Sequence, residues 1–255
     1  MDDLKIKKKS TADLVCEKMK SMISNGTWQY YQKIPSESDL AEMFGVNRLT
    51  VRIALQRLNA LGILDTRVGD GTYVCHFDLG QHIKDVSEFY MTPKLLEDVS
   101  EFRRVFEIEC ARLAIQKRTE EDLRQLKERC LQYEQANAAY FRLLEAEGPQ
   151  SPALKAACDR LDHADIAFHE QICAMSHNDL LVYAFAVAKP AILEQIVQNS
   201  KIRLPFLVAD QGAGSVRGHW DIYHAIEQRD PDACQAYYLA MIDPHNATPY
   251  TKDET

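Results

Sequence analysis

Apolar residues recur at helical spacing in three short segments near the beginning of the chain, at residues 10–25, 36–44 and 48–60. Hydroxyl side chains that can cap a helix stand at the start of the first two segments, and Gly26 and Gly45 directly follow them. Only three residues separate the second segment from the third. This spacing predicts three helices, of which the second and third form a helix-turn-helix.

A different pattern follows at residues 63–74. Two short runs of strand-forming residues flank Gly69-Asp70-Gly71, which has the composition of a tight turn. This segment therefore predicts a β-hairpin. Helix, helix, turn, helix and hairpin is the order of elements in a winged helix-turn-helix.

Beyond about residue 78 the pattern predicts helices and no strand, with loops at residues 147–150 and 203–214. The expected fold class is mainly α: an N-terminal winged helix-turn-helix over residues 1–77, with a small β-hairpin wing, and a C-terminal all-α helical bundle over residues 78–255. The helices expected in the bundle comprise residues 80–90, 93–117, 120–146, 152–176, 179–199, 214–229 and 231–242.

Charge is divided unevenly between these two parts. The whole chain has a net charge of −8, but residues 1–77 carry 11 Lys and Arg against 9 Asp and Glu. The remainder carries 19 against 29. A DNA reader joined to a separate acidic sensor would show this division.

The composition also favours a location in the cytoplasm. The seven cysteines are scattered singly with no CxxC pair, which fits buried thiols in a reducing compartment better than a disulfide framework. The first ten residues are charged and lead into no apolar segment of a secretory signal. No stretch approaches 18 uninterrupted apolar residues, so we expect no membrane span.

The third predicted helix has the side chains of a DNA-reading helix. Arg48, Arg52 and Gln56 recur every four residues, on the face opposite the apolar one. Arginine and glutamine contact guanine and adenine edges in the major groove. Residues 43–64 contain no acidic residue, as a surface facing phosphates requires, and Arg67 stands at the base of the wing. An exposed basic helix face is the simpler interpretation of the helix alone, but the surrounding fold pattern favours DNA binding.

These residues resemble the GntR family of bacterial regulators. The resemblance covers nearly all of residues 10–76 and implies that Arg48 and Arg52 contact bases, that Thr50 lies close to DNA, and that Gly71 lies at the wing tip in the minor groove. The motifs that carry it are Ile34-Pro35-Ser36-Glu37-Ser38-Asp39-Leu40-Ala41, Gly45-Val46-Asn47-Arg48-Leu49-Thr50-Val51-Arg52-Ile53-Ala54-Leu55 and Gly69-Asp70-Gly71-Thr72-Tyr73-Val74. Ser38, Ile53 and Asp70 depart from the residues common in the family, which leaves the operator sequence open.

Residues 95–242 resemble the FCD type of effector domain found in the FadR-like branch of that family. The similar stretches are Glu101-Phe102-Arg103-Arg104-Val105-Phe106-Glu107, Ala111-Arg112-Leu113-Ala114, Asp165-Ile166-Ala167-Phe168-His169, Ser176-His177-Asn178, Gly218-His219, Ala225-Ile226 and Asp230. The resemblance implies that a small-molecule effector binds within this helical domain.

A divalent metal (Zn, Ni or Mn) is the candidate cofactor of this domain. Asp165 and His169 are four residues apart, so their side chains can converge, although such a pair alone is more often a hydrogen bond. The resemblance implies that these two residues and His219 are metal ligands. Met241 stands where the family's further histidine is expected, and a thioether is a poor ligand for these metals. The metal and a metal-free pocket therefore both remain open.

Two further residues are candidates for effector binding. By resemblance Arg103 points inward at an effector carboxylate, which its planar guanidinium suits. The alternative is a surface salt bridge to Glu107, four residues on. Asn178 could line the same pocket.

The sequence thus predicts a ligand-responsive transcriptional regulator, most simply a repressor, that binds an inverted repeat as a homodimer and is controlled by a small organic acid. One alternative is a metal-dependent hydrolase with an accessory winged helix, but no HExxH motif or nucleophile elbow is present. Another is an interaction module without a ligand, which would have no need of converging metal ligands.

Overall fold

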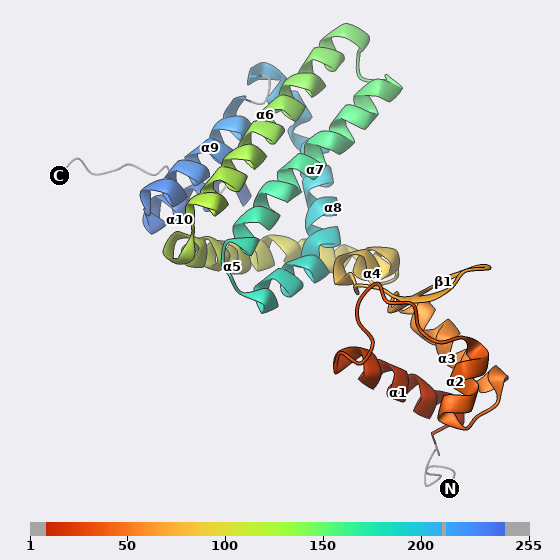
Figure 1. Ribbon diagram of the computed structural model, residues 1–255. Helices are drawn as coiled ribbons and strands as arrows, with labels where there is room; N and C mark the ends of the chain where they lie inside the picture. Colours follow the sequence, from red (N-terminus) through yellow and green to blue (C-terminus); the bar gives the residue numbers. More distant parts are fainter. Residues whose placement is uncertain (1–8, 211–212, 243–255) are drawn as a thin grey trace, which may run out of the picture. The chain divides into compact units, whose positions relative to one another are not determined.

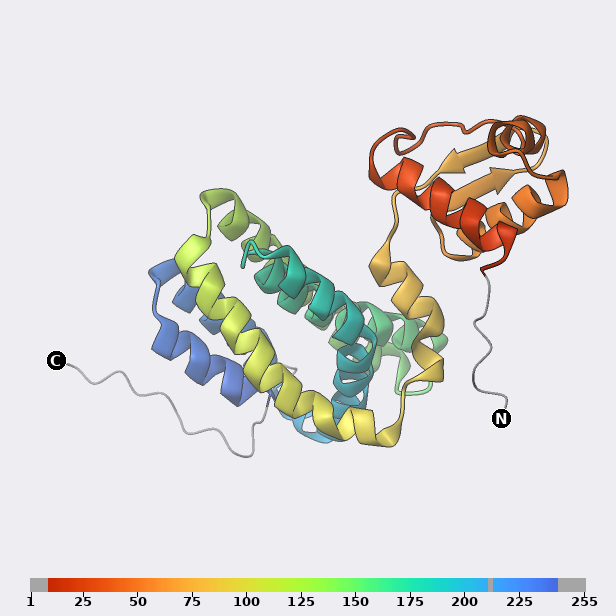
Figure 2. The same cartoon turned by 90° about the horizontal axis from the view of Figure 1, so that it is seen from below.

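The computed structural model describes residues 9–210 and 213–242, and the chain divides into two compact units, Met1–His82 and Ile83–Thr255. Among its described residues, the first, here the N-terminal unit, contains three complete helices, the beginning of a fourth and a two-stranded antiparallel sheet, which Figure 2 shows beside the helices. Its elements are α1 (Thr11–Ser24), α2 (Glu37–Phe44), α3 (Arg48–Ala60), β1 (Leu64–Arg67) and β2 (Gly71–Val74).

Capping residues fix where these helices begin and end. The Ser36 hydroxyl accepts the Asp39 backbone N–H, and the Asp39 carboxylate accepts the Ser36 backbone N–H. Both of these N–H groups at the start of α2 therefore have an acceptor. Gly45 ends α2 with φ +63°, a left-handed conformation that glycine adopts without strain. The Asn47 side chain then accepts the Thr50 N–H and starts α3, which completes the predicted helix-turn-helix.

The buried faces of these elements form one small core. Met19 of α1, Leu40 of α2, and Val51 and Leu58 of α3 are fully buried, and Val74 of β2 covers them. Hydrophobic burial of this kind holds the exposed face of α3 in a fixed orientation relative to the hairpin. The core therefore determines which side chains of α3 and of the wing reach the surface together.

The segment before α2 also joins the hairpin. The Tyr31 and Ile34 backbone N–H groups donate to the Val74 and Thr72 carbonyls of β2, both at 2.8 Å. The Val74 N–H donates in return to the Gln32 carbonyl at 2.9 Å. This pairing ties the chain that enters α2 to the base of the wing.

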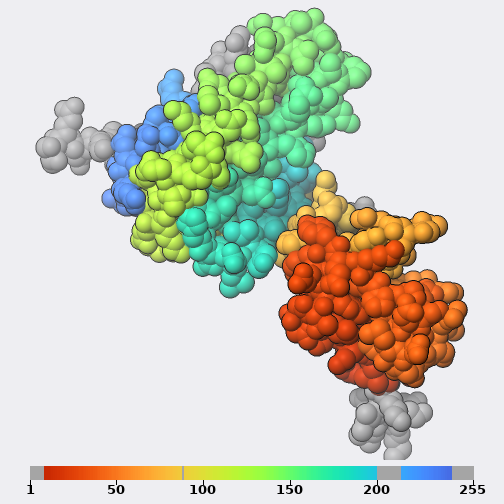
Figure 3. Space-filling view, viewed as in Figure 1, coloured from red at the N-terminus to blue at the C-terminus, as the bar shows by residue number. Residues whose placement is uncertain are grey.

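The second unit, here the helical unit, contains no β-strand among its described residues, as the sequence predicts. Helices α6 and α7 lie side by side, and α9 lies along α6 (Figure 1). In the view of Figure 3, α6 and the beginning of α7, in green, form much of the surface of this unit. The helices are α4 (Leu79–Val86), which spans the division between the units, the 3₁₀ turn η1 (Ser87–Phe89), α5 (Pro93–Lys117), α6 (Glu120–Glu147), α7 (Pro152–Ala174), α8 (Asp179–Asp210), α9 (Ala213–Gln228) and α10 (Pro231–Ile242).

The largest core of this unit lies among α5, α6, α7, α9 and α10. Leu126, Phe168, Ile172, Ile222 and Tyr238 are all fully buried there. Phe168 directly precedes His169, and Tyr238 packs near the same histidine, with 5.7 Å between ring centroids. The core thus fixes the backbone on which the candidate ligand residues stand.

Helix α8 is longer than the sequence pattern predicts. We expected a loop over residues 203–214, whereas α8 continues to Asp210 and α9 begins at Ala213. Pro205 lies within this continuation of α8. A proline inside a helix costs about 3 kcal/mol but does not forbid the helix, and α8 already passes through Pro190.

Residues 179–199 of α8 are long and apolar enough to cross a membrane by length and composition, with a mean hydropathy of 1.6. A core helix of a soluble protein passes the same test. Phe185, Ile192 and Ile196 of this segment are buried in a cluster with Val99 of α5 and Ile166 of α7. These residues account for part of the apolar composition of this segment, of which 28% is buried.

Candidate functional site

The first candidate site is the outer face of α3. Arg48, Arg52 and Gln56 are exposed, whereas Val51 and Leu55 on the opposite side are buried in the core. Thr50 is half-buried at the beginning of the helix, where its N–H donates to the Asn47 side chain at 2.8 Å. The structure thus brings the side chains predicted to read DNA to one solvent-facing surface.

The second part of this surface is the wing. Arg67 is exposed, donates to Asp65 at 3.0 Å and stacks over the Tyr73 ring, 4.4 Å from its centroid. Gly71 has φ +142°, a conformation that side-chain-bearing residues rarely adopt, and the Lys33 side chain crosses directly over it. The wing is therefore a tight turn with one arginine at its base.

Asp70 at the wing tip does not project freely. Its carboxylate accepts the Tyr73 hydroxyl at 3.0 Å and the Lys33 ammonium at 3.3 Å. These contacts lower the Asp70 pKa, through the Tyr73 hydrogen bond first and then Lys33. The acidic residue that departs from the family pattern is thus locally neutralised by Lys33.

The second candidate site lies inside the helical unit, where Asp165, His169 and His219 converge. One ligand atom from each of these residues lies within 4.8 Å of the others. Asp165 and His169 come from successive turns of α7, and α9 supplies His219. Both histidines are buried, whereas the Asp165 side chain retains 20% exposure. Asp165 and His169, which their spacing places on one face of a helix, are thus joined by His219, which is far away in sequence.

Neighbouring groups fix the orientation of both imidazoles. The Glu107 carboxylate lies 2.8 Å from His169 Nδ1, and the Ser215 carbonyl lies 2.8 Å from His219 Nδ1. The Tyr133 ring stacks on His219 with 3.9 Å between centroids. In metal sites an oxygen on one ring nitrogen holds the ligand histidine and directs the other nitrogen at the metal.

The remaining nitrogens and the Asp165 carboxylate face one another. His169 Nε2 lies 3.2 Å from Asp165 Oδ1, and His219 Nε2 lies 4.0 Å from the same oxygen. His219 Nε2 is buried and has no hydrogen-bond partner. Buried polar atoms are seldom left unpaired, and this nitrogen is free to accept a hydrogen bond or to bind a metal ion.

Arg103 and Glu107 form a buried ion pair beside this cluster. Arg103 Nε donates to Glu107 Oε1 at 2.7 Å, and Arg103 Nη1 donates to Gln195 at 3.3 Å. The predicted alternative of a surface salt bridge with Glu107 is therefore wrong in one respect: the pair exists, but both side chains are at most 5% exposed. Arg103 points inward, and its Nη2 lies 3.2 Å from His169 Nε2.

The charges of the cluster set the protonation of its members. Burial alone would raise the Asp165 pKa, but the His169 hydrogen bond and nearby positive charge lower it to about 2. Burial likewise opposes ionisation of Glu107, yet Arg103 and His169 lower its pKa to about 2. Burial lowers the His219 pKa to about 4, so this imidazole is neutral and able to bind a metal at neutral pH.

His169 is held between opposing influences. Burial lowers its pKa, but the Glu107 and Asp165 carboxylates outweigh this effect and raise it, while Arg103 opposes a proton at the same nitrogen. A metal cation at His169 Nε2 would replace that proton and would also bind the Asp165 carboxylate. The residues present therefore fit a divalent cation.

A small cavity of about 60 Å³ opens onto this cluster. Arg103, Asp165, His169 and Met241 all line it. Met241 thus lies beside the ligand cluster, at the position where the family resemblance implies a histidine. The structure does not bring Asn178 to this cavity: Asn178 is exposed, and its side chain accepts the Leu180 N–H at the start of α8.

Sequence reasoning missed two contributors to this site. Glu107 was considered only as a partner for Arg103, although it also orients His169. Asp162 is buried and lines the cavity, which gives the site a third carboxylate. The only available signal was position: Asp162 lies three residues before Asp165 on the same helix, a neighbouring position.

An exposed basic helix with a wing, in a chain whose second unit is helical and has a polar internal site, is the arrangement of a DNA-binding regulator with a further domain. Comparison with known proteins agrees. Residues 11–74 match the family described as bacterial regulatory proteins, gntR family, and residues 98–243 match the FCD domain. The chain belongs to the GntR family and carries an FCD domain, so it is a DNA-binding transcriptional regulator and not an enzyme.

Individual relatives extend over most of the chain. The HTH-type transcriptional regulator LutR of Bacillus subtilis is 31% identical over 87% of this chain and 93% of its own length. The Glc operon transcriptional activator of Escherichia coli is 28% identical over 91% of this chain and 86% of its own length. A solved structure described as Streptococcus agalactiae GntR has a TM-score of 0.63, with 22% identity over 91% of this chain and 96% of that one, which shows the same fold.

Proposed function

We propose that the chain binds a short inverted-repeat operator as a homodimer through α3 and the wing. The support is the exposed row of Arg48, Arg52 and Gln56, with Arg67 and Gly71 in the wing. Each winged helix presents one reading helix, so a two-fold dimer would read two half-sites whose spacing the dimer fixes. As a reader of chromosomal DNA, the chain would act in the cytoplasm.

We further propose that the cluster in the helical unit is the effector site and that Asp165, His169 and His219 hold a divalent metal there. The observation that carries this proposal is the buried His219 Nε2, unpaired and directed among the other ligand atoms. Nitrogen and carboxylate ligands suit zinc, nickel or manganese. A bound metal would supply Lewis-acid positions for oxygen atoms of an effector.

The proposed effector is a small organic acid, such as a hydroxy-, keto- or sugar acid. Arg103 lines the cavity, and its Nη1 donates only to the neutral Gln195 amide, which a carboxylate would displace as a stronger acceptor. The cavity of about 60 Å³ favours a small ligand over a long acyl chain. The carboxylates of Glu107, Asp162 and Asp165 lie near Arg103, the one arginine among the described residues that line the cavity. An anionic effector would therefore need the positive charge of a metal ion in addition to that of Arg103.

The proposed outcome of effector binding is release of repression. A ligand shifts DNA affinity only if it binds the DNA-competent and DNA-incompetent arrangements of the dimer with different affinities. A reporter gene behind the operator would test the direction: loss of the regulator should raise expression, and the effector should do the same. Lower expression on loss of the regulator would identify it as an activator instead.

Gel shifts on the chain's own upstream region test the DNA-binding proposal. Arg48→Ala and Arg52→Ala should each weaken specific binding by about fivefold or more, because a bidentate base contact is lost. Lys18→Ala is a matched control, since it removes one charge from an exposed position of α1. Wild-type affinity in both arginine variants would show that α3 is not the reading helix.

Thermal shift and metal analysis test the effector site. The purified chain should retain a divalent metal and gain thermal stability with hydroxy, keto or sugar acids in proportion to ligand occupancy. His219→Ala should abolish both effects, whereas His224→Ala, an exposed histidine of the same helix, should preserve them. Stabilisation by acyl-CoA or amines alone would overturn the proposed effector class.

A further inference from the structure

Three arginines of the N-terminal unit form ion pairs with carboxylates. Among the described residues of that unit, Arg48 alone of the four arginines has no ion pair. The pairs at Arg57 and Arg67 join these residues to Asp13 and Asp65. The pair at Arg52 differs from both, because it lies on the proposed base-reading face of α3 and its partner Glu37 comes from α2.

Glu37 holds Arg52 by one edge only. Arg52 Nε donates to Glu37 Oε1 at 3.1 Å, and Arg52 Nη2 donates to Glu37 Oε2 at 2.7 Å. A guanidinium has five N–H groups, and this side-on fork uses two of them. The end-on edge, with one N–H from each terminal nitrogen, stays free. That edge has the geometry for bidentate donation to guanine O6 and N7.

The Glu37 carboxylate is not explained by folding energy alone. Both partners are partly exposed, at 56% for the Arg52 side chain and 35% for Glu37, and exposed ion pairs contribute little to stability. A carboxylate beside the reading helix also repels DNA phosphates and weakens binding to every sequence. The capping box of α2 is made by Ser36 and Asp39, so the helix has its N-terminal cap without Glu37.

We propose that Glu37 is a positioning residue for DNA recognition: it fixes the Arg52 guanidinium so that the end-on edge reads guanine. The inference rests on the proposed base contact of Arg52. Restricting a flexible arginine to one orientation raises discrimination between bases, because a fixed fork fits one pattern of acceptors. The repulsion from phosphates lowers affinity for other sequences at the same time. Glu37 therefore exchanges general affinity for specificity at one base pair of each half-site.

The experiment uses the full chain and duplexes of known sequence. Selection from a randomised duplex pool defines the preferred site, and affinities are then measured for that site, for variants with each guanine replaced, and for a scrambled duplex. In Glu37→Gln, discrimination at one guanine of each half-site should fall by about fivefold or more. Affinity for the scrambled duplex should rise, because one negative charge is lost.

Glu42→Gln is the matched control. Glu42 is exposed on the same helix and is in no ion pair among the described residues, so this variant removes the same charge without releasing Arg52. It should leave discrimination at every guanine unchanged. A merely structural role for Glu37 would lower affinity for all duplexes alike, and circular dichroism establishes that each variant is folded.

Two outcomes separate this inference from the proposed function. If Arg52→Ala loses discrimination at a guanine while Glu37→Gln keeps wild-type discrimination everywhere, the positioning role is wrong and the reading helix stands. If Arg52→Ala itself keeps wild-type affinity and discrimination, the base contact of Arg52 is wrong, and the role of Glu37 is overturned with it.

Discussion

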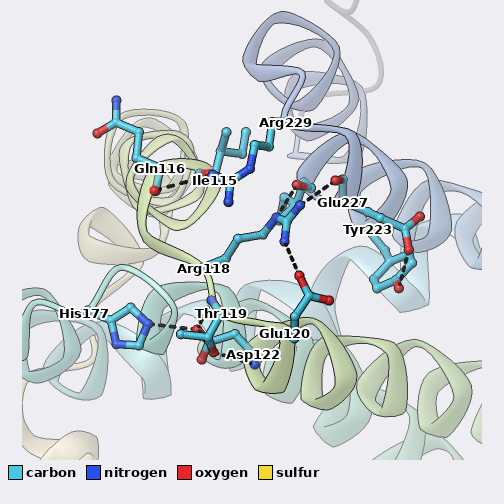
Figure 4. A network of polar contacts seen from close by, with 11 residues as sticks. Ile115, Gln116, Arg118, Thr119, Glu120, Asp122, His177, Tyr223, Glu227 and Arg229 are labelled. Atoms are coloured by element: carbon cyan, nitrogen blue, oxygen red, sulfur yellow. Dashed lines mark hydrogen bonds and ion pairs between the residues drawn. The ribbon is translucent and has the colours of Figure 1, made fainter.

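Arg118 and Arg229 each bind the end of the helix that the other one follows. Arg118, directly after α5, donates to the Ile226 and Glu227 carbonyls of α9 at 3.0 and 2.7 Å. Arg229, directly after α9, donates to the Ile115 carbonyl of α5 at 2.5 Å (Figure 4). The last carbonyls of a helix lack partners within it and carry partial negative charge. Each arginine therefore gives the end of the other helix both hydrogen-bond donors and a positive charge.

This exchange predicts a strong dependence of the helical unit on both arginines. Arg118→Met and Arg229→Met should each lower the free energy of unfolding by about 1–3 kcal/mol, because charge-assisted hydrogen bonds to helix-end carbonyls are lost. Urea unfolding followed by circular dichroism measures the change. Arg124→Met, which breaks an exposed pair with Glu121, should change stability by less than about 1 kcal/mol. Equal effects in all three variants would contradict the reciprocal role.

Local sequence signals predicted the helix boundaries well, because capping is a local interaction. The Ser36 hydroxyl caps α2 as predicted, in a capping box with Asp39, and α5 covers the predicted residues 93–117, with Thr92 as its cap. The end of α8 could not be predicted in this way. Whether a helix continues past a proline depends on the packing of the whole helix, which the local pattern does not contain.

The candidate site was predictable only as far as residues share one helix. The spacing of Asp165 and His169 indicated that they converge, but it could not place His219, which required the family resemblance. The spacing of Arg103 and Glu107 is the same for an exposed pair and for a buried one. Their burial, and the contact of Glu107 with His169, arise from α5 packing on α7, a long-range property of the fold.

The two glycines of the wing should respond differently to the same substitution. Gly69 has φ +78° and open space around its Cβ position, and asparagine tolerates this left-handed region. Gly71 has φ +142°, which residues with a side chain rarely adopt, and a Cβ there would also displace the flexible end of Lys33. Gly71→Asn should therefore destabilise the N-terminal unit by about 1–3 kcal/mol and weaken DNA binding, whereas Gly69→Asn should stay near wild type. Thermal unfolding and gel shifts measure both, and similar losses in the two variants would contradict the strained turn.

Met241 offers a direct test of the metal site. It lines the cavity with Asp165 and His169, so Met241→His adds an imidazole where the wild type has a weakly binding thioether. The affinity for zinc should rise by about tenfold or more, as expected when a ligand is added, and titration calorimetry on chelator-treated protein measures it. Met241→Leu keeps the volume and should leave zinc affinity unchanged. An unchanged affinity in the histidine variant would show that residue 241 is outside the coordination sphere.

The stability of the metal-free helical unit should fall in acid in two stages. His219 has a folded pKa of about 4 against an ordinary value of 6.5, so between these pH values the unfolded chain binds a proton that the folded chain refuses. Stability is then lost as pH falls from 6.5 towards 4, by up to about 1.4 kcal/mol per pH unit for one proton. His169, whose pKa is raised, keeps its stabilising proton throughout this range.

Glu107 and Asp165 dominate the second stage. Their pKa values of about 2 lie below the ordinary values of 4.5 and 3.8, so their contribution is present above pH 4.5 and is lost as pH falls towards 2. A Trp28→Phe variant leaves Trp220 as the reporter of the helical unit in urea titrations from pH 7 to pH 3. His219→Gln should remove the loss between pH 6.5 and 4.5 and retain the loss below it. An unaltered first stage in that variant would show that another group causes it.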